Sequence, residues 1–519
     1  MVANNQLVNE SRSGTLTSSL VASALVLLTF GVAQARMPIG IPTPPFGLQE
    51  TPAMYASDAS YASNVHGPYT HYVDNSGNCS DSGSGTEATP RCSLPTRLNA
   101  GDVVQVHGGP YRPQSDVRIV VSGTSAAPIF ITGVIANGNR PVFDSVDSNG
   151  KLYIDGSYAI VENIEFATSG LRLGNESASD HLSARNVEVN WHEKNCISVR
   201  GDYIVVADSE LHHCIDNTKD RHGFQVLAGS NHVWVLRNHI HHNGGNGIQY
   251  THNAESNPPD YVFIGGNLIH SDREVGIASK WVRRSVVSSN IIHSVRASQR
   301  GQQFCFDDNS ACMTPESATN GPGIHFGADG FPVEKWVIHN LIYDTNHCIR
   351  VEEANKARII GNICADIVGA GVMLEKRADD LIISNNTFVR TGQNQNDSVV
   401  KQYWRNGFTV DFQNNLIINP GHTLWFESRS VMNTIDFNNN LLWNNGQNFS
   451  IRWANRQTTA RSLNDLRSLM QPDVHEFQNN IVSDPRFQVA ARSEYTRAYF
   501  APPANIPVTD GANNQLLEL

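Results

Sequence analysis

The chain has 519 residues, of which 40% are hydrophobic and 17% are charged, so it can build a large core and is not intrinsically disordered. Its 40 glycines, 23 prolines and low charge favour a β-rich chain with many turns over a helical one. The net charge of −11 and the lack of a basic run argue against a nucleic-acid partner. A polyanionic substrate would therefore need positive side chains gathered in one groove.

The N-terminus has the pattern of an export signal. Arg12 precedes an apolar stretch from Leu20 to Ala33, and Ala33-Gln34-Ala35 is a small-x-small cleavage site. This predicts a signal peptide over residues 1–35 and a linker over 36–67. A membrane anchor is the alternative, but the stretch is short for a span, which needs about 20 apolar residues. We expect a secreted or periplasmic monomer with no membrane contact after cleavage.

Eight cysteines, an even number, suit an oxidising compartment. Their spacing suggests pairing between neighbours in the sequence, although other connectivities stay open. A zinc site is the rival interpretation, which the absence of any Cys-x-x-Cys motif disfavours. The local pairs are Cys79–Cys92, Cys196–Cys214, Cys305–Cys312 and Cys348–Cys364.

An internal repeat predicts the fold. A polar residue, usually Asn, followed by apolar residues recurs with a base period of 22–25 residues and occasional insertions, which is the signature of a solenoid. The short apolar runs have strand period and no helical length. We therefore predict a right-handed parallel β-helix over residues 68–495, with three short strands per coil. The repeated residues are Asn238, Asn267, Asn290, Asn340, Asn386, Asn415, Asn440 and Asn480, with weaker copies at Glu162, Arg185, Ser209 and Asn362.

Stacked asparagines at one bend can hydrogen-bond from coil to coil, which explains why Asn recurs there. Two segments are expected to be helical caps. The first is Leu94–Ala100, over the first coil, and the second lies within Thr459–Met470, where apolar residues fall near helical spacing. Residues 496–519 are expected to form a tail.

One strand of each coil opens with Gly or Cys and can be aligned across six repeats. Strand alternation turns the first and third following residues inward and the second and fourth outward. The inward pairs are Phe224/Val226, Ile248/Tyr250, Ile277/Ser279, Ile324/Phe326, Ile349/Val351 and Val372/Leu374. The outward residues are Gln225, Gln249, Ala278, Lys280, His325, Arg350, Glu352, Met373 and Glu375.

Lys280, His325 and Arg350 thus fall on three consecutive coils of one outer face. Two insertions, Thr251–Pro259 and Ala297–Gly321, flank this face, and long loops around a short stretch of a regular solenoid are typical of a binding site. The alternative is that Lys280 is an ordinary solvent-exposed lysine of a polar face, with no role in function. A second column, His212, His241, His270 and His293, lies on a different sheet, where stacking makes a ladder more plausible than a metal site.

The segments Tyr72–Gly77 and Ala100–Tyr111, with the 22–25-residue coils, resemble secreted polysaccharide lyases of the pectate-lyase-like β-helix superfamily. Glu274-Val-Gly-Ile-Ala-Ser-Lys280 is similar to the strand that carries the lysine base in family-9 pectate lyases. Family-6 alginate and chondroitin lyases likewise place glutamates shortly before a catalytic lysine. The resemblance implies β-elimination from a uronic-acid polymer.

In that reading Lys280 is the base that removes the proton α to the carboxylate, with the cations Arg283 and Arg284 close enough in sequence to assist it. Arg350 and His325 neutralise the substrate carboxylate or protonate the leaving oxygen. The expected sugar contacts are His222, Gln225, Gln249, Arg283 and Glu352.

The sequence departs from the family-9 pattern at the position of the calcium cluster. The matching stretch, Gly245–Gln249, has lost every carboxylate, so calcium is doubtful and activity is expected to survive chelation. The carboxylates that remain nearby as tentative calcium ligands are Asp220, Asp272 and Glu274.

Three alternatives to a lyase stay open. A uronate C5-epimerase uses the same proton abstraction. A glycoside hydrolase needs two carboxyls, for which Glu352 and Glu375 occupy equivalent positions on adjacent coils. A non-enzymatic carbohydrate-binding adhesin is the third, and the groove loops argue against it. Fold alone decides none of these.

Overall fold

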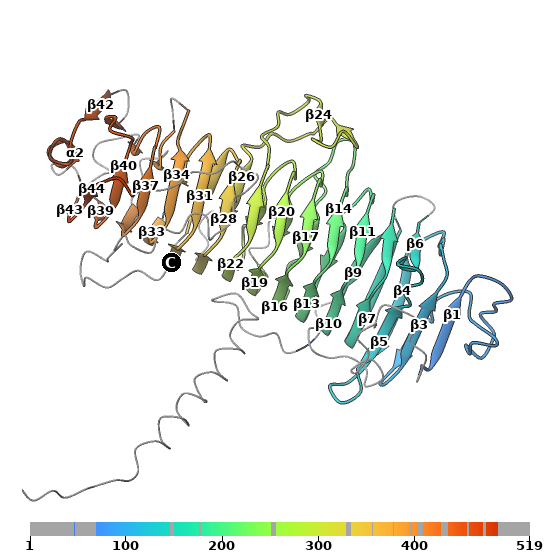
Figure 1. Ribbon diagram of the computed structural model, residues 1–519. Helices are drawn as coiled ribbons and strands as arrows, with labels where there is room; N and C mark the ends of the chain where they lie inside the picture. Colours follow the sequence, from blue (N-terminus) through green and yellow to red (C-terminus); the bar gives the residue numbers. More distant parts are fainter. Residues whose placement is uncertain are drawn as a thin grey trace, which may run out of the picture. The chain divides into compact units, whose positions relative to one another are not determined.

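The protein is a parallel β-helix in which successive coils stack strand on strand (Figure 1). This computed structural model confirms the fold predicted from the repeat. The described residues are 46, 69–145, 150–175, 178–250, 256–327, 334–354, 356–376, 378–394, 397–402, 408–426, 434–453, 456–470 and 474–485. The predicted signal 1–35, the linker 36–67 apart from Phe46, and the tail 496–519 lie outside them.

The first coils form before the regular repeat begins. The long strand β7 pairs with strands of two rows and so joins them into one 29-stranded sheet. The N-terminal strands are β1 (His71–Asp74), β2 (Arg97–Asn99), β3 (Val103–His107), β4 (Val117–Ser122), β5 (Ile129–Gly133), β6 (Val142–Asp144) and β7 (Lys151–Glu162).

The prediction of a helix over Leu94–Ala100 is wrong. Arg97–Asn99 is strand β2, which pairs in parallel with β4 so that Leu98 lies opposite Val121. Exposure alternates along β2, with Leu98 buried between two exposed neighbours. That period of two is the strand pattern, and it satisfies the backbone groups that a short cap helix would leave unpaired.

The first row of the 29-stranded sheet carries the candidate site and is called the site sheet below. Its strands are β9 (Gly170–Leu173), β12 (Ile197–Val199), β15 (Phe224–Val226), β18 (Ile248–Tyr250), β21 (Ile277–Ser279), β26 (Pro322–Phe326), β29 (His347–Val351), β32 (Val372–Leu374), β35 (Val400–Gln402), β38 (Leu424–Phe426) and β41 (Phe449–Trp453). All the inward pairs predicted for it are buried, because side chains alternate across a strand.

The second row continues the same sheet through β7. Its strands are β10 (Asp180–Arg185), β13 (Asp202–Ala207), β16 (Asn231–Leu236), β19 (Asp260–Gly265), β22 (Arg284–Ser288), β27 (Glu334–Ile338), β30 (Lys356–Ile360), β33 (Ala378–Ser384), β36 (Phe408–Gln413), β39 (Ile435–Asn438) and β43 (Glu476–Gln478). Its β-branched and aromatic residues, such as Val235, Ile264 and Phe437, point into the shared core.

The third row is a separate 13-stranded sheet, called the histidine sheet below. Besides β6 it contains β8 (Glu165–Ala167), β11 (Glu188–Asn190), β14 (Glu210–His212), β17 (His239–His241), β20 (Leu268–His270), β23 (Ile291–His293), β28 (Leu341–Tyr343), β31 (Ile363–Ile367), β34 (Thr387–Thr391), β37 (Leu416–Ile418), β40 (Leu441–Trp443) and β44 (Ile481–Val482). Its central residues, Ile240 and Ile269 among them, complete the core.

An asparagine ladder runs along the bend before the histidine sheet, as the repeat predicted. In each step the Nδ2 group donates to the Oδ1 atom of the next asparagine, as from Asn290 to Asn340 at 2.9 Å, and to a strand carbonyl. The next asparagine's Oδ1 also accepts the backbone N–H at 3.0 Å. A net gain of about 1 kcal/mol per hydrogen bond makes this buried column a repeated source of stability. It includes Asn238, Asn267, Asn290, Asn340, Asn362, Asn386, Asn415, Asn440 and Asn480.

The helical cap predicted within Thr459–Met470 forms only in its second part. Helix α2 (Leu463–Met470) forms, with Leu466 and Met470 fully buried against the last coil. Thr459 and Ala460 belong instead to β42 (Arg456–Ala460), which pairs antiparallel with β41. No helix of the described residues is long and apolar enough to span a membrane.

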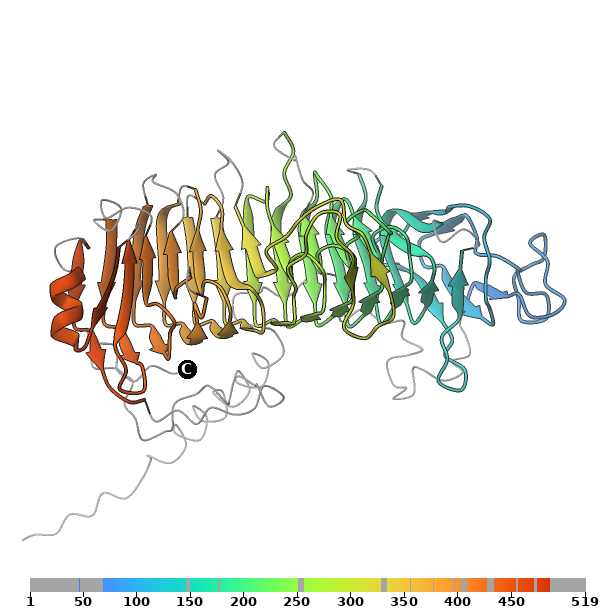
Figure 2. The same cartoon turned by 90° about the horizontal axis from the view of Figure 1, so that it is seen from above.

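All four predicted disulfides are present, so every cysteine is paired. The Cys305–Cys312 bond closes a two-stranded hairpin of β24 (Phe304–Cys305) and β25 (Cys312–Met313). This hairpin belongs to the insertion 297–321, called the wall loop below. The wall loop lies over the strands that precede it in the chain, as the two views agree (Figures 1 and 2).

Candidate active site

The predicted outward residues form one column across the site sheet. The register aligns Gln249 with Ala278, Ala278 with His325, and His325 with Arg350 on four successive strands. Lys280 follows directly after β21 on the same face. These residues line a groove with a volume of about 590 Å³. Its lining comprises Asp220, His222, Asn246, Gln249, Glu274, Val275, Ala278, Lys280, Ala318, Thr319, Asn320, His325 and Arg350.

The wall loop closes one side of the groove. Ser317 donates to both carboxylate oxygens of Asp220, at 2.9 and 3.0 Å, and Thr319 donates to the carbonyl of Glu274 at 2.9 Å. The fully buried guanidinium of Arg273 bonds to Asp220, to Ser298 and to Ser317. These bonds hold the loop segment 318–320 against the sheet, so the insertion that the sequence singled out does contribute to the groove.

Lys280 lies at the centre of a charged cluster with Glu352. Its Nζ is 3.9 Å from Glu352 Oε2, and the side chain is 28% exposed. Glu352 also accepts from His325 Nε2 at 3.1 Å and from Lys376 Nζ at 2.9 Å. The hydrogen bond from His325 holds the pKa of Glu352 well below its usual value, so this carboxylate is ionised and orients the other groups.

His325 is a neutral imidazole in this setting. It is 2% exposed, and burial lowers its pKa to about 3 despite the hydrogen bond to Glu352. Arg350, one strand further, donates to Glu375 Oε2 at 2.6 Å, and its Nε has no hydrogen-bond partner among the described residues. The groove is therefore lined by a cationic side chain that Glu375 holds in place.

Glu274, which the sequence suggested as a calcium ligand, is a buried titratable group of the groove. Burial, together with the nearby carboxylate of Asp220, raises its pKa to about 7, against smaller opposing effects from Arg273 and Lys280. Part of the population therefore carries a proton on this carboxyl near neutral pH. Nothing in the residue order of 274–280 reports that burial, which explains why sequence reasoning assigned Glu274 to calcium.

Polar groups suited to sugar hydroxyls sit at the other end of the groove. His222 Nδ1 accepts the backbone N–H of Asn246 at 2.9 Å, and burial lowers its pKa to about 3, so this ring is also neutral. The Asn246 amide donates to Gln249, while its Oδ1 has no partner among the described residues. In the sequence, Asn246 stands only as a position where the family-9 calcium carboxylates are missing. In the structure it lines the groove and becomes a further candidate sugar contact.

Several predicted site residues do not reach the groove. Gln225 accepts from Asn195 at 2.7 Å one strand away, and the exposed Arg283 follows β21 outside the lining. Arg284, expected near Lys280, instead pairs with Asp260. Glu352 is absent from the lining and contacts Lys280 and His325, which line it.

Only two of the three tentative calcium ligands are brought together. Asp220 and Glu274 line the groove, but Asp220 is bound by Arg273 and Ser317. Asp272 is fully buried beneath the sheet surface, where its Oδ1 accepts from the backbone and side chain of Asn243 at 2.9 Å. The donor set therefore does not fit a calcium ion.

Asp272 should make the protein's stability depend on pH. Burial raises its pKa to about 8, and its Oδ2 has no hydrogen-bond partner among the described residues. A raised folded-state pKa means that stability is fully present below about pH 4 and is lost as the pH rises through about 8. Asp272→Asn keeps the acceptor without the charge, so we expect this variant to be more stable than wild type above pH 7. Thermal unfolding from pH 4 to 8 checks this, and a lower melting temperature of the variant at pH 8 would contradict it.

The histidine column behaves as the predicted ladder on its own sheet. The rings of His212, His241, His270 and His293 stack with centroid separations of 4.9, 5.0 and 4.8 Å. Their planes are within 7° of parallel. Burial lowers the pKa of His270 to about 3, so neutral rings can stack without charge repulsion.

No family model matches the sequence, and no curated protein matches it. Solved structures resemble it distantly. A family-6 polysaccharide lyase from Pseudopedobacter saltans has a TM-score of 0.43 and 14% identity, covering 75% of this chain and 89% of its own. An alginate lyase from Paenibacillus sp. has a TM-score of 0.34 and 11% identity, covering 59% of this chain and 92% of its own.

A family-136 lacto-N-biosidase from Eubacterium ramulus has a TM-score of 0.41 and 15% identity. The match covers 72% of this chain, which spans 63% of the length of the lacto-N-biosidase. Likenesses of this size, which include lyases and a hydrolase, carry no argument about substrate or mechanism.

Proposed function

We propose that the protein is a polysaccharide lyase that cleaves a uronic-acid-containing polymer, pectate-like or alginate-like, by β-elimination. The observation that carries the proposal is that Lys280, Arg350, the neutral His325 and the proton-holding Glu274 line one groove. An elimination needs a base, a cation for the substrate carboxylate and a proton donor for the leaving oxygen. The groove supplies a candidate for each.

Lys280 is proposed as the base. In its unprotonated form, the Lys280 amine takes the proton from C5 of the uronate, the electron pair forms the C4–C5 double bond, and the bond from C4 to the glycosidic oxygen breaks. Glu352, bound to Lys280 and His325 and not to the substrate, positions the amine. A lysine is suited to this role because its ammonium loses a proton more readily than a guanidinium does.

Arg350 is proposed to pair with the substrate carboxylate, where negative charge grows as the proton leaves. Its fixed contact with Glu375 gives it a defined direction in the groove. The neutral His325 donates to Glu352 and keeps that carboxylate turned toward Lys280. Sugar hydroxyls would contact His222, Asn246 and Gln249, while Gln225, aligned with Gln249 on the preceding strand, is a candidate contact for a neighbouring sugar unit.

Glu274 is proposed to protonate the leaving glycosidic oxygen. With a pKa raised to about 7 by burial and by Asp220, it holds a proton near neutral pH and can release it during the reaction. Lys280 gains a proton and Glu274 loses one, so the proton balance closes once the two exchange with solvent.

A glycoside hydrolase is the second candidate, favoured by the neighbouring carboxyls of Glu274 and Asp220 in the groove. One would be the acid and the other the base or nucleophile. The pair considered from the sequence, Glu352 and Glu375, serves this reading less well, because neither carboxylate lines the groove.

Product analysis separates the candidates. The protein would be incubated with pectate, alginate and glycosaminoglycans while ultraviolet absorbance and reducing ends are followed. A lyase gives reducing ends together with the absorbance of unsaturated uronates, which is the result we expect. Reducing ends without absorbance would establish hydrolysis, and a change in uronate configuration without new ends would establish an epimerase.

Calcium is not expected to take part in the reaction. Asp272 is buried away from the groove and Asp220 is neutralised by Arg273, so the carboxylates do not form a calcium site. Adding calcium to metal-stripped enzyme should leave the initial rate of elimination unchanged. A rate that rises from near zero with calcium would contradict this prediction.

We also propose that the protein works outside the cytoplasm as a monomer. Four disulfides in one chain persist in an oxidising compartment and are rare in the cytosol. A polymeric substrate, which cannot enter a cell intact, fits the same location.

A further inference from the structure

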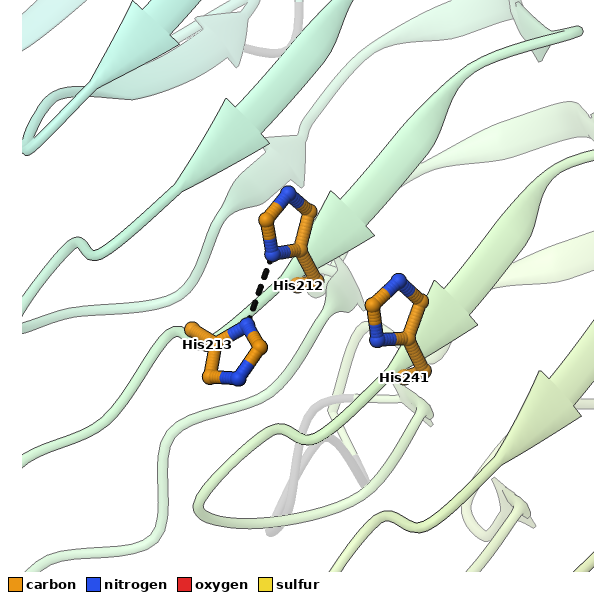
Figure 3. Close-up of side chains that lie close together, drawn as sticks. All are labelled: His212, His213 and His241. Carbon is orange, nitrogen blue, oxygen red and sulfur yellow. Dashed lines mark hydrogen bonds between the residues drawn. The ribbon is translucent and has the colours of Figure 1, made fainter. Parts of the chain in front are cut away.

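A second cluster of chemistry-bearing side chains lies where the wall loop meets the histidine sheet, away from the groove. His213 and His242 directly follow β14 and β17 on successive coils, and their rings stack with centroids 5.1 Å apart and planes 2° from parallel. Figure 3 shows how His213 turns away from the strand while its neighbour His212 stacks on His241 of the next coil.

Two carboxylates of the wall loop meet these rings. His213 Nε2 is 2.9 Å from Asp308 Oδ2, and His242 Nε2 is 2.9 Å from Asp307 Oδ1 and 3.7 Å from Asp308 Oδ2. The donor atoms of His213, His242 and Asp308 all lie within 4.8 Å of one another. Ser310 Oγ is 2.8 Å from His213 Nε2 and donates to Asp308 Oδ1 at 2.7 Å.

Each ring belongs to a chain of three polar contacts that begins and ends on a carboxylate. The first runs from Glu188 to His212 Nε2 at 3.4 Å, from His212 Nδ1 to His213 Nδ1 at 2.7 Å (Figure 3), and from His213 Nε2 to Asp308. Carboxylates only accept, and a neutral imidazole has one N–H. Three hydrogen bonds therefore need three hydrogens, and two neutral rings supply two.

The second chain repeats the pattern one coil later. Glu210 is 3.1 Å from His241 Nε2, the Nδ1 atoms of His241 and His242 are 2.7 Å apart, and His242 Nε2 faces Asp307. It too lacks one hydrogen. The two chains together lack two hydrogens, at rings whose side chains are only 9% and 11% exposed.

We propose that His213, His242 and Asp308 form a binding site for one divalent transition-metal ion, most simply Zn²⁺, with Asp307 beside His242. A metal ion on the two Nε2 atoms takes the place of the two hydrogens that the chains lack. Imidazole nitrogens and carboxylate oxygens are ligand types that zinc accepts. With the metal in place, the Nδ1–H groups of the two ligand histidines donate to His212 and His241. Those rings in turn donate to Glu188 and Glu210, which fixes every tautomer.

The site would fasten the wall loop to the body of the β-helix. Asp307 and Asp308 lie inside the disulfide-closed hairpin between Cys305 and Cys312, and the same loop reaches the groove at 318–320. The Cys305–Cys312 bond closes the hairpin on itself without tying it to the sheet, whereas a metal ion would bridge the two. This role is structural and does not depend on the reaction in the groove.

Metal titration of the full chain, purified without a polyhistidine tag and stripped with a chelator, tests the proposal. We expect one Zn²⁺ to bind per chain by calorimetry, and Co²⁺ in its place to give the visible absorption of a nitrogen- and oxygen-ligated ion. Asp308→Asn and His242→Gln should each weaken binding by at least about 10-fold. His293→Gln, in the neighbouring ladder of His212, His241 and His270, is the matched control and should bind like wild type.

Asp308→Asn keeps the test decisive, because this side chain lies in a surface loop and its loss does not threaten the fold. Zinc should also slow tryptic cleavage after the exposed Arg300 in wild type and not in Asp308→Asn. No saturable binding by wild type would overturn the proposal. So would unchanged affinity in Asp308→Asn with a loss in His242→Gln, which would place the ion on the ladder histidines alone.

Discussion

Lys280→Ala should lose roughly 10²–10⁴-fold in turnover, the range expected when a general base is removed. The binding of substrate should change little, because Arg350 and the amide groups of the groove stay in place. The melting temperature should stay close to wild type, because Glu352 keeps its bonds to His325 and Lys376. Initial rates from ultraviolet absorbance, together with thermal unfolding, measure both effects.

The matched control is Lys376→Ala. Lys376 contacts the same carboxylate at 2.9 Å and is similarly exposed, but it does not line the groove. A general loss of charge around Glu352 would lower the rate of both variants, whereas a base role lowers only that of Lys280→Ala. Lys280→Arg should be nearly as inactive as Lys280→Ala, because a guanidinium does not release its proton near neutral pH. An arginine variant that keeps most of its rate would remove Lys280 from the mechanism.

The fold was predictable from the sequence because the same residue types recur at equivalent positions in each coil. A ladder asparagine such as Asn340 must recur at the same bend, since each one bonds to those before and after it. The inward positions, such as Ile324, must be apolar in every coil. The segment around Leu98 was misjudged because it lies before the regular repeat, where one short apolar run fits a strand and a helix equally well.

The candidate site was predictable as far as strand register determines it. The column of His325 and Arg350 beside Lys280 follows from alternation alone. Contacts made by the wall loop are different, because no periodicity says which coil an insertion will cover. The buried pairing of Asp220 with Arg273, the proton on Glu274 and the meeting of Asp308 with His213 all depend on that loop or on burial.

Glu274→Gln is the second variant with a large expected effect. If Glu274 protonates the leaving oxygen, its acid form is required, so kcat/KM of wild type should fall as the pH rises above about 7. The glutamine variant has no proton to give, and we expect its rate to be roughly 10²–10⁴-fold lower at pH 6 and to lack that alkaline fall. A calcium-ligand role would predict instead a calcium-dependent defect with an unchanged pH profile.

Stability gives an independent measurement on the same variant. The folded-state pKa of Glu274 is raised, so wild type loses stability between about pH 4.5 and 7, as the buried carboxyl is forced to ionise. Glutamine removes that charge, and the variant should be more stable than wild type at pH 8 by up to about 3 kcal/mol. Glu316→Gln, an exposed glutamate of the wall loop, is the control and should change neither property. A Glu274→Gln enzyme that is more stable at pH 8 yet fully active would confirm that Glu274 is buried but contradict its role as proton donor. Another group of the groove would then have to protonate the glycosidic oxygen.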